Sequence, residues 1–165
     1  MLKMERLVKR CRFKKVSAIV AGGATRFESV RNCLKLVGDE FEIVLIHDGA
    51  RPFVDGGLIS ASIRKAVAAD SAIAAVPEND TVKLAGGDLV IKKTIERRRL
   101  WRAQTPQVFK SSVIKKAYAR SNGRGVTDDA SLVESMGLKV SIVPGSYRNI
   151  KITTEEDLRI AEALI

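Results

Sequence analysis

The sequence predicts an α/β protein of the Rossmann-like kind, with a mostly parallel sheet, flanking helices and a projecting β-hairpin arm. Two observations predict this class. Short β-rich runs alternate with segments of helical periodicity along most of the chain. After Pro77 the period changes to that of two short strands around a turn. The length of 165 residues falls within the usual range of one domain, so we expect a single domain over residues 1–165.

Three short runs in the first half of the chain predict the strands. They are VSAIVA (16–21), EIVLI (42–46) and SAIAAV (71–76). Each is apolar and short, which is typical of strands buried on both faces of a parallel sheet.

Two longer segments between these runs predict helices. TRFESVRNCLKLVG (25–38) has apolar residues at helical spacing and ends at a glycine, and GGLISASIRKAVAA (56–69) has the same spacing. The apolar face expected of the second helix consists of Leu58, Ile59, Ile63 and Val67.

The hairpin is predicted by two runs of partly alternating polarity. TVKL (81–84) and LVIKKTI (89–95) flank an Ala-Gly-Gly-Asp turn. We expect residues 78–98 to form an arm that leaves the main sheet.

The rest of the chain returns to helices and strands. SSVIKKAYAR (111–120), DDASLVESMG (128–137) and TEEDLRIAEALI (154–165) predict helices, the last with a capping box at its start. KVSIVPG (139–145) and NIKIT (149–153) predict strands.

The composition excludes some function classes and leaves others open. No apolar run approaches the roughly 18–20 residues of a membrane span, and the start lacks the pattern of a secretory signal, so we expect a cytoplasmic protein without a membrane partner. Cys11 and Cys33 suggest neither a disulfide framework nor a zinc site. The net charge of +10 favours nucleic acid, a membrane surface or phosphorylated ligands, and the total alone does not separate them.

The strand at 42–46 ends on chemistry that a core does not need. His47, Asp48, Gly49 and Arg51 follow it directly. Ligands of open α/β sheets bind beyond the carboxyl ends of the strands, where a carboxylate can hold Mg²⁺, a glycine lets a ligand approach and an arginine can bind phosphate. Simpler explanations are a helix cap for Asp48 and a surface ion pair for Arg51.

Three more segments carry polar groups of the same kind. Arginines surround Trp101 and are followed by QTPQ, which we expect to be too polar for a core strand; Thr127 opens a helix; and Lys151 interrupts a β-rich run. Each also has a structural explanation as a solvated charge, a cap or a gatekeeper at a strand edge.

Together these segments resemble the 2-C-methyl-D-erythritol 4-phosphate cytidylyltransferase family, a nucleotidyltransferase type. The matching blocks run in order from about Val16 to the C-terminus and are GGATRFESV, LIHDGARPF, AAVPENDTVK, RRRLWRAQTPQVF, TDDASLVE and VPGSYRNIKITTEEDL. The resemblance implies transfer of a cytidylyl group from CTP to methylerythritol phosphate in isoprenoid biosynthesis, with release of pyrophosphate.

The resemblance also assigns roles to residues. The catalytic residues would be Arg97 and Lys151. The substrate-binding residues would be Asp48, Arg51, Thr81, Thr105, Thr127 and Thr153. The nucleotide-binding residues would be Gly22, Gly23, Ser29 and Gly49. The family uses Mg²⁺, for which Asp48 would be the ligand, and forms homodimers in which the arm reaches the partner's site.

One departure from the family leads to alternatives. Members begin with a strand and a Gly-rich loop, A-A-G-x-G-x-R, that holds the triphosphate, and nothing upstream of Val16 matches it. We therefore expect an N-terminally truncated cytidylyltransferase. The alternatives are a ribitol-5-phosphate cytidylyltransferase and a non-catalytic remnant that lacks CTP binding. Nucleic-acid binding is a third class, which the sparse aromatic residues disfavour.

Overall fold

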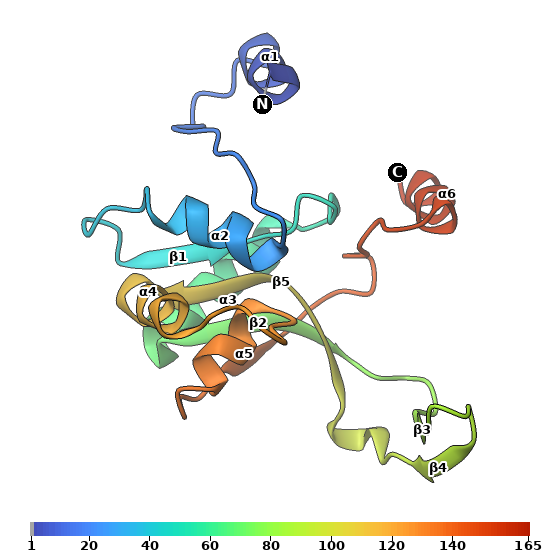
Figure 1. Ribbon diagram of the computed structural model, residues 1–165. Coiled ribbons are helices and arrows are strands. Elements are labelled where there is room, and N and C mark those ends of the chain that lie inside the picture. The colour runs from blue at the N-terminus through green and yellow to red at the C-terminus, as the bar shows by residue number, and fades with distance from the viewer. Residues whose placement is uncertain (1) are drawn as a thin grey trace.

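The computed structural model describes residues 2–165, and its centre is a four-stranded sheet in the order β1-β5-β2-β6 (Figure 1). The strands are β1 (Ile43–Ile46), β2 (Ser71–Pro77), β5 (Trp101–Lys110) and β6 (Ser141–Pro144). β5 is antiparallel to both β1 and β2, whereas β6 is parallel to β2. Three of the four strands therefore point the same way, and the predicted α/β class with a mostly parallel sheet is confirmed.

Helices cover both faces of this sheet and make three layers. Ala72 and Ala74 of β2 pack with Leu58 of α3 (Gly56–Ala69), whereas Ile73 between them packs on the opposite face. That opposite face is covered by α2 (Arg26–Leu34), α4 (Ser111–Arg120) and α5 (Asp129–Glu134). The alternation follows from the period of two of a strand and divides the core into two clusters.

The hairpin arm is present and projects from the body (Figure 1). β3 (Lys83–Ala85) and β4 (Ile91–Thr94) form a separate two-stranded sheet, followed by the short 3-10 helix η1 (Arg97–Arg99). Every residue of β3 and β4 is exposed. A two-stranded hairpin buries little apolar surface by itself, so hydrogen bonds, such as the ladder and the one from Lys83 Nζ to Thr94 Oγ1 at 2.8 Å, hold the arm together.

Two predicted strands are wrong. Residues 16–21 and 149–153 are irregular, since neither is paired in a ladder among the described residues. Their composition suits a strand, but β structure needs a neighbour to accept its hydrogen bonds. The helix predicted over 25–38 also ends early, because α2 stops at Leu34 and a turn follows.

The prediction that QTPQ is too polar for a core is wrong as well. Residues 104–109 are buried in β5, between β1 and β2. Their polar side chains find hydrogen-bond partners far away in sequence, which removes the cost of burial. The face of α3 is also rotated from the one predicted: Leu58, Ser62 and Ala66 are buried, while Val67 is exposed.

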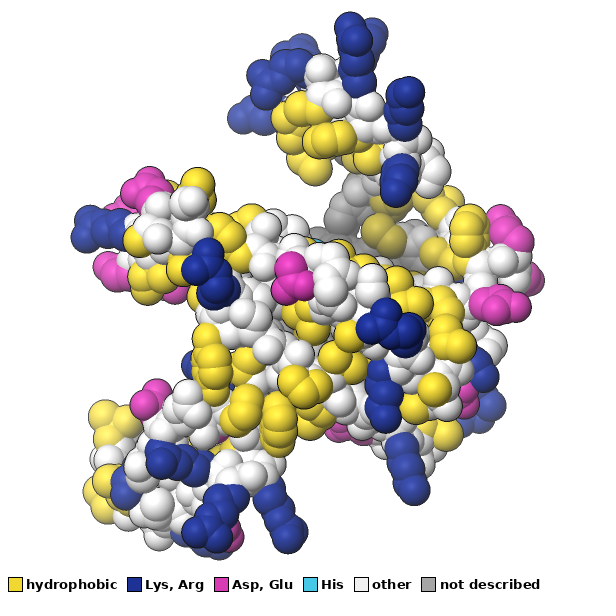
Figure 2. Space-filling view, turned by 180° about the vertical axis from the view of Figure 1, so that it is seen from behind, with side chains coloured by type: hydrophobic (Ala, Val, Ile, Leu, Met, Phe, Trp, Pro, Cys, Tyr) yellow, Lys and Arg dark blue, Asp and Glu magenta, His cyan; other side chains and the backbone are white. Residues whose placement is uncertain are grey.

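Two terminal helices lie apart from the sheet. α1 (Leu2–Arg10) has no buried residue, and α6 (Glu155–Ala163) buries Ala161 alone. Lys and Arg side chains gather over α1 and over the arm (Figure 2). Among residues 2–165 no helix has the length and apolarity needed to cross a bilayer.

Candidate functional site

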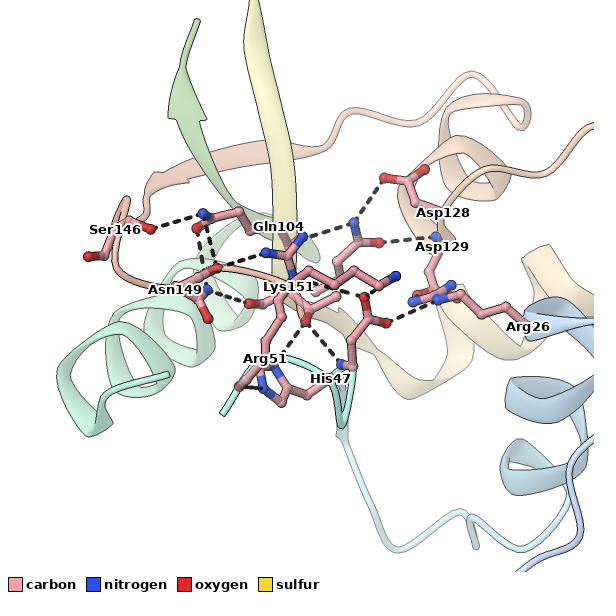
Figure 3. A network of polar contacts seen from close by, with 12 residues as sticks. Arg26, His47, Arg51, Gln104, Asp128, Asp129, Ser146, Asn149 and Lys151 are labelled. Atoms are coloured by element: carbon pink, nitrogen blue, oxygen red, sulfur yellow. Dashed lines mark hydrogen bonds and ion pairs between the residues drawn. The ribbon is translucent and has the colours of Figure 1, made fainter. Parts of the chain in front are cut away.

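Asp48 lies just after the end of β1, among three cations. Its Oδ1 is 3.2 Å from Arg26 Nε, and its Oδ2 is 3.0 Å from Lys151 Nζ and 3.9 Å from Arg51 Nε. Arg26 and Lys151 approach from opposite sides (Figure 3). Arg26 also pairs with Asp129 at 2.6 Å, so two carboxylates face three cations, and the remaining positive charge favours an anionic ligand.

The loop that carries Lys151 is held against the middle of β5. The Asn149 side chain, fully buried, donates from Nδ2 to the carbonyl oxygen of Thr105 at 2.9 Å and to Gln104 Oε1 at 3.3 Å. Arg51 Nη1 donates to the Asn149 carbonyl at 2.7 Å. The backbone N–H of Ile152 also donates to the Ala50 carbonyl at 2.8 Å. The loops after β1 and β6 are thus joined, and this joint sets the position of Lys151.

Thr105 and His47 fix the turn that presents Asp48. The backbone N–H of Asp48 donates to Thr105 Oγ1 at 3.0 Å. The same hydroxyl lies 3.0 Å from His47 Nδ1, and His47 Nε2 lies 3.0 Å from the Arg51 carbonyl oxygen. Thr105 is buried, so its hydroxyl holds the backbone of Asp48 from the core side of the site.

A cavity of about 330 Å³ opens beside these groups. Arg51 and Lys151 line one part, and Arg102, Tyr147 and Asp157 line another. A larger cavity of about 550 Å³ lies near Phe41 and Lys110, at the opposite end of β1, and none of the predicted site residues lines it. The smaller cavity is the candidate site because it is the one that the loop cations face.

Neighbouring cations and hydrogen-bond donors shift the pKa values of the two carboxyl groups at the site, Asp48 and Asp157. Burial alone would raise the pKa of Asp48, but hydrogen bonds from Lys151 and Arg26 hold that pKa below its ordinary value. Burial lowers the pKa of Arg51, and the charge of Asp48 opposes this. Hydrogen bonds from the hydroxyl and backbone of Thr153, and from the backbone of Thr154, lower the pKa of Asp157 to about 2. Both carboxyl groups are therefore ionised at neutral pH.

The structure brings some of the predicted residues together and leaves others apart. Asp48, Arg51, Lys151 and Thr105 make one network, as their contacts above show. Thr153 lies next to it, with its hydroxyl donating to Asp157 Oδ2 at 2.7 Å.

Three of the predicted catalytic and substrate-binding residues lie outside that network. Arg97 belongs to η1, and its guanidinium donates to the carbonyl oxygen of Asn79, within the arm. Thr81 precedes β3 on the same arm. Thr127 is exposed just before α5.

The predicted nucleotide-binding residues have structural duties at the start of α2. The Ser29 hydroxyl accepts from the Gly23 N–H at 3.0 Å and donates to the Thr25 carbonyl at 2.9 Å. A Cβ on Gly23 would lie 2.2 Å from Glu28 Cβ, and one on Gly22 would lie 3.0 Å from Ser29 Oγ. Close packing against α2 thus explains both glycines. A Cβ on Gly49 would meet nothing within 4 Å.

Sequence reasoning missed several residues of the site. Arg26 was noticed as part of a matching block and given no role, although it contacts Asp48. Arg102 lies over the Tyr147 ring at 5.6 Å and lines the cavity with it. The Arg26 contact joins residues 22 positions apart, which no local pattern can reveal.

The residues present do not build a metal site by themselves. Within residues 2–165 no group of three or more His, Cys, Asp or Glu side chains is placed to hold a metal ion. Asp48, the predicted ligand, has both carboxylate oxygens in contact with cations. Mg²⁺ usually takes six oxygen ligands, and the described residues do not supply such a set by themselves.

Comparison with known proteins identifies relatives along almost the whole chain. A family model described as 2-C-methyl-D-erythritol 4-phosphate cytidylyltransferase matches residues 3–165, so the similarity starts before Val16. The curated protein of that name from Pelotomaculum thermopropionicum is 48% identical over 161 residues, covering 96% of this chain and 68% of its own. Its counterpart from Syntrophus aciditrophicus is 51% identical over 153 residues, covering 92% and 65%. The chain thus spans about two thirds of these relatives' length.

Solved structures with similar names are also similar to this chain in sequence and fold. A 4-diphosphocytidyl-2C-methyl-D-erythritol synthase from Anaerococcus prevotii is 36% identical with a TM-score of 0.86, covering 97% of this chain and 76% of its own. A 2-C-methyl-D-erythritol 4-phosphate cytidylyltransferase from Thermus thermophilus is also 36% identical, with a TM-score of 0.80, covering 92% and 74%.

Proposed function

The chain belongs to the 2-C-methyl-D-erythritol 4-phosphate cytidylyltransferase family, and we propose from this that it transfers a cytidylyl group from CTP to 2-C-methyl-D-erythritol 4-phosphate. The substrate phosphate attacks the α-phosphorus of CTP, and pyrophosphate leaves. The proposal keeps the cytoplasmic location that the sequence predicts.

The observation that carries the proposal is the cationic cavity beside Asp48. Arg51 and Lys151 line it, and their side chains are anchored to Asp48 and Asn149 rather than left free in solvent. A phosphate in this cavity would meet two cations that are already oriented. Phosphoryl transfer depends mainly on positioning and on stabilisation of charge on the phosphate oxygens, which such a cavity can supply.

Asp48 has a specific part in this arrangement. It holds Lys151 Nζ at 3.0 Å through Oδ2, which limits the freedom of a long side chain before the substrate binds. One contact to a carboxylate leaves two of the three donors of the ammonium for phosphate. Lys151 and Arg51 would orient the attacking phosphate, and Asp48 would orient Lys151.

We propose that Mg²⁺ takes part in the reaction only when it binds together with CTP. Substrate phosphates and water commonly supply most ligands of a Mg²⁺, and Asp48 would join them only by giving up one of its contacts to Arg26 or Lys151. Transfer that continues in excess chelator would remove the metal from the proposal.

We propose that the arm contributes to the site of a second copy of the chain. Leu84, Leu89, Val90 and Ile91 on and around the hairpin are 53–88% exposed, more apolar surface than an arm needs in isolation. The Arg97 guanidinium donates to the Asn79 carbonyl oxygen, within the arm. A homodimer in which the arm reaches the partner's site would cover those side chains and give Arg97 and Thr81 a substrate to contact. Light scattering with and without residues 80–96 tests this directly.

The test of the reaction is pyrophosphate release by the 165-residue chain given CTP, Mg²⁺ and methylerythritol phosphate, with ribitol 5-phosphate in parallel. Release that requires both CTP and methylerythritol phosphate supports the proposal, and preference for ribitol 5-phosphate replaces the substrate. A folded protein that binds methylerythritol phosphate but neither binds CTP nor releases pyrophosphate would make the chain the non-catalytic remnant.

A further inference from the structure

Arg26 connects the candidate site to a carboxylate inside the core. Its Nε donates to Asp48 Oδ1 at 3.2 Å, and its Nη2 donates to Asp129 Oδ2 at 2.6 Å. Arg26 lies at the start of α2 and Asp129 at the start of α5 (Figure 3), whereas Asp48 follows the end of β1.

Asp129 is a fixed point for this contact. It is completely buried, accepts a hydrogen bond from Tyr118 Oη through Oδ1, and its backbone N–H donates to Gln107 Oε1 at 3.0 Å. Tyr118 is itself buried and stacks on Phe27 with ring centroids 4.7 Å apart. A buried carboxylate held on these sides cannot move without breaking the core, so the Arg26 guanidinium that pairs with it is held as well.

The geometry also requires an arginine. The guanidinium presents donors in a planar fork and reaches two carboxylates at once, whereas an ammonium is a point charge. Neutralising Asp129 alone would not require a contact between Arg26 and Asp48. Asp48 is a separate carboxylate, 81 positions away from Asp129 in the chain.

The contact decides how Asp48 meets the other cations. In the observed orientation Oδ1 faces Arg26, and Oδ2 faces Lys151 and Arg51. The terminal torsion of aspartate is broad. Without Arg26, Asp48 could rotate and turn both oxygens toward Lys151 and Arg51, occupying the donors that a phosphate needs.

We propose that Arg26 is a positioning residue for substrate phosphate: anchored on Asp129 and Tyr118, it orients Asp48 so that Lys151 and Arg51 keep donors free for the anion. This inference rests on the proposed function for the identity of the substrate, and it adds a residue that acts through Asp48 without touching the substrate.

The test compares Arg26→Gln and Arg26→Lys with the control Arg31→Gln. Arg31 lies on the same helix, is exposed and contacts the Phe27 ring, so the control removes equal charge without touching Asp48. Arg26→Gln leaves Asp129 buried without its cation, so a second variant, Arg26→Gln with Asp129→Asn, removes that charge and protects the fold.

The first readout is the calorimetric affinity for 2-C-methyl-D-erythritol 4-phosphate, with thermal midpoints measured alongside. We expect a loss of about 10–100-fold for both glutamine variants, as for other residues that orient a ligand-binding group. We expect a smaller loss for Arg26→Lys and a change within about twofold for Arg31→Gln. A lower midpoint with unchanged affinity in the double variant would reduce Arg26 to a structural role and overturn the proposal.

The second readout does not depend on the substrate. A crystal structure of the double variant should show Asp48 rotated, with both oxygens on Lys151 and Arg51. An Asp48 that keeps its single contact to Lys151 overturns the proposal. If the unsubstituted chain binds no methylerythritol phosphate while Asp48 rotates in the variant, the positioning role stands and the proposed function fails.

Discussion

The body of the protein and its hairpin arm use polar residues in opposite ways. In the body, Gln104, Thr105 and Gln107 of β5 are buried, and each bonds to another segment: Gln107 to Asp128 and α5, Thr105 to Asp48, and Gln104 to Ser146. On the arm, all residues of β3 and β4 are exposed, and Arg97 bonds to Asn79 within the arm. The body is fixed by long-range contacts, whereas the arm has local ones.

This difference separates the two residues that the resemblance pairs as catalytic. Lys151 is already held by Asp48 and by the loop around Asn149, so its position is set within one chain. Arg97 has no such anchor among the described residues, and its position relative to a substrate depends on what the arm meets. Substitution of a site residue in the body should therefore weaken substrate binding in any oligomeric state. Substitution of a site residue on the arm should weaken substrate binding only in an oligomer.

The largest expected effect is on stability and follows substitution of Gln107. It tests whether long-range polar contacts stabilise the body. Gln107 Oε1 accepts from the N–H groups of Asp129 and Ala130, and Nε2 donates to Asp128. Gln107→Leu leaves two buried N–H groups without an acceptor, at about 1–3 kcal/mol each. We expect urea denaturation to show a loss of about 2–6 kcal/mol in unfolding free energy.

The matched control for this prediction is on the arm. Lys93→Ala in the exposed strand β4 should change the unfolding free energy by less than about 0.5 kcal/mol. Equal losses in the two variants would contradict the division into a cooperative body and a dependent arm.

The same residues explain how far the sequence could predict the structure. Helices α3 and α4 were predicted with correct bounds, since periodicity and flanking residues are local signals. The buried QTPQ segment was missed because its polarity is satisfied from outside: Gln104 bonds to Ser146 and Asn149, more than 40 positions away. Local composition reports the cost of burying an amide but not the partner that offsets it.

The site was predictable to the same extent. Asp48 and Arg51 were found because polar residues after a strand stand out in a sequence, whereas Lys151 lay inside a run predicted as a strand and took its role from the family resemblance. Arg26 opens a helix at an ordinary position, and its partner Asp129 is 103 positions away, so no local signal separates it from a solvated arginine.

A smaller effect is expected from comparing Lys151→Ala with Arg97→Ala. Removing a charge-assisted hydrogen bond to phosphate costs about 1.5–3 kcal/mol, so Lys151→Ala should weaken methylerythritol phosphate binding about 10–100-fold at every protein concentration. Arg97→Ala should match the unsubstituted chain when light scattering shows monomers and weaken binding only when it shows dimers. Weaker binding by Arg97→Ala in the monomer would place the arm in its own chain's site.

The smallest effect is expected at α6, which resembles the arm in having little packing of its own. The capping box at Thr154 holds the start of this helix, and Asp157 accepts hydrogen bonds from Thr153 and Thr154 that lower its pKa from 3.8 to about 2. Because the folded pKa is depressed, this stabilisation is complete above about pH 4 and is lost as the pH falls toward 2. A carboxyl NMR titration should therefore find Asp157 still ionised at pH 3.

Thr153→Ala sharpens this last prediction, because it removes the hydroxyl that donates to Asp157 Oδ2 at 2.7 Å. The Asp157 midpoint should rise toward 3.8 in that variant. A side-chain hydroxyl donates one hydrogen bond, so a Thr153 that gives it to Asp157 can only accept from a substrate. If the midpoint is the same with and without that hydroxyl, Thr153 is free to donate to phosphate, and its predicted place among the substrate-binding residues becomes stronger.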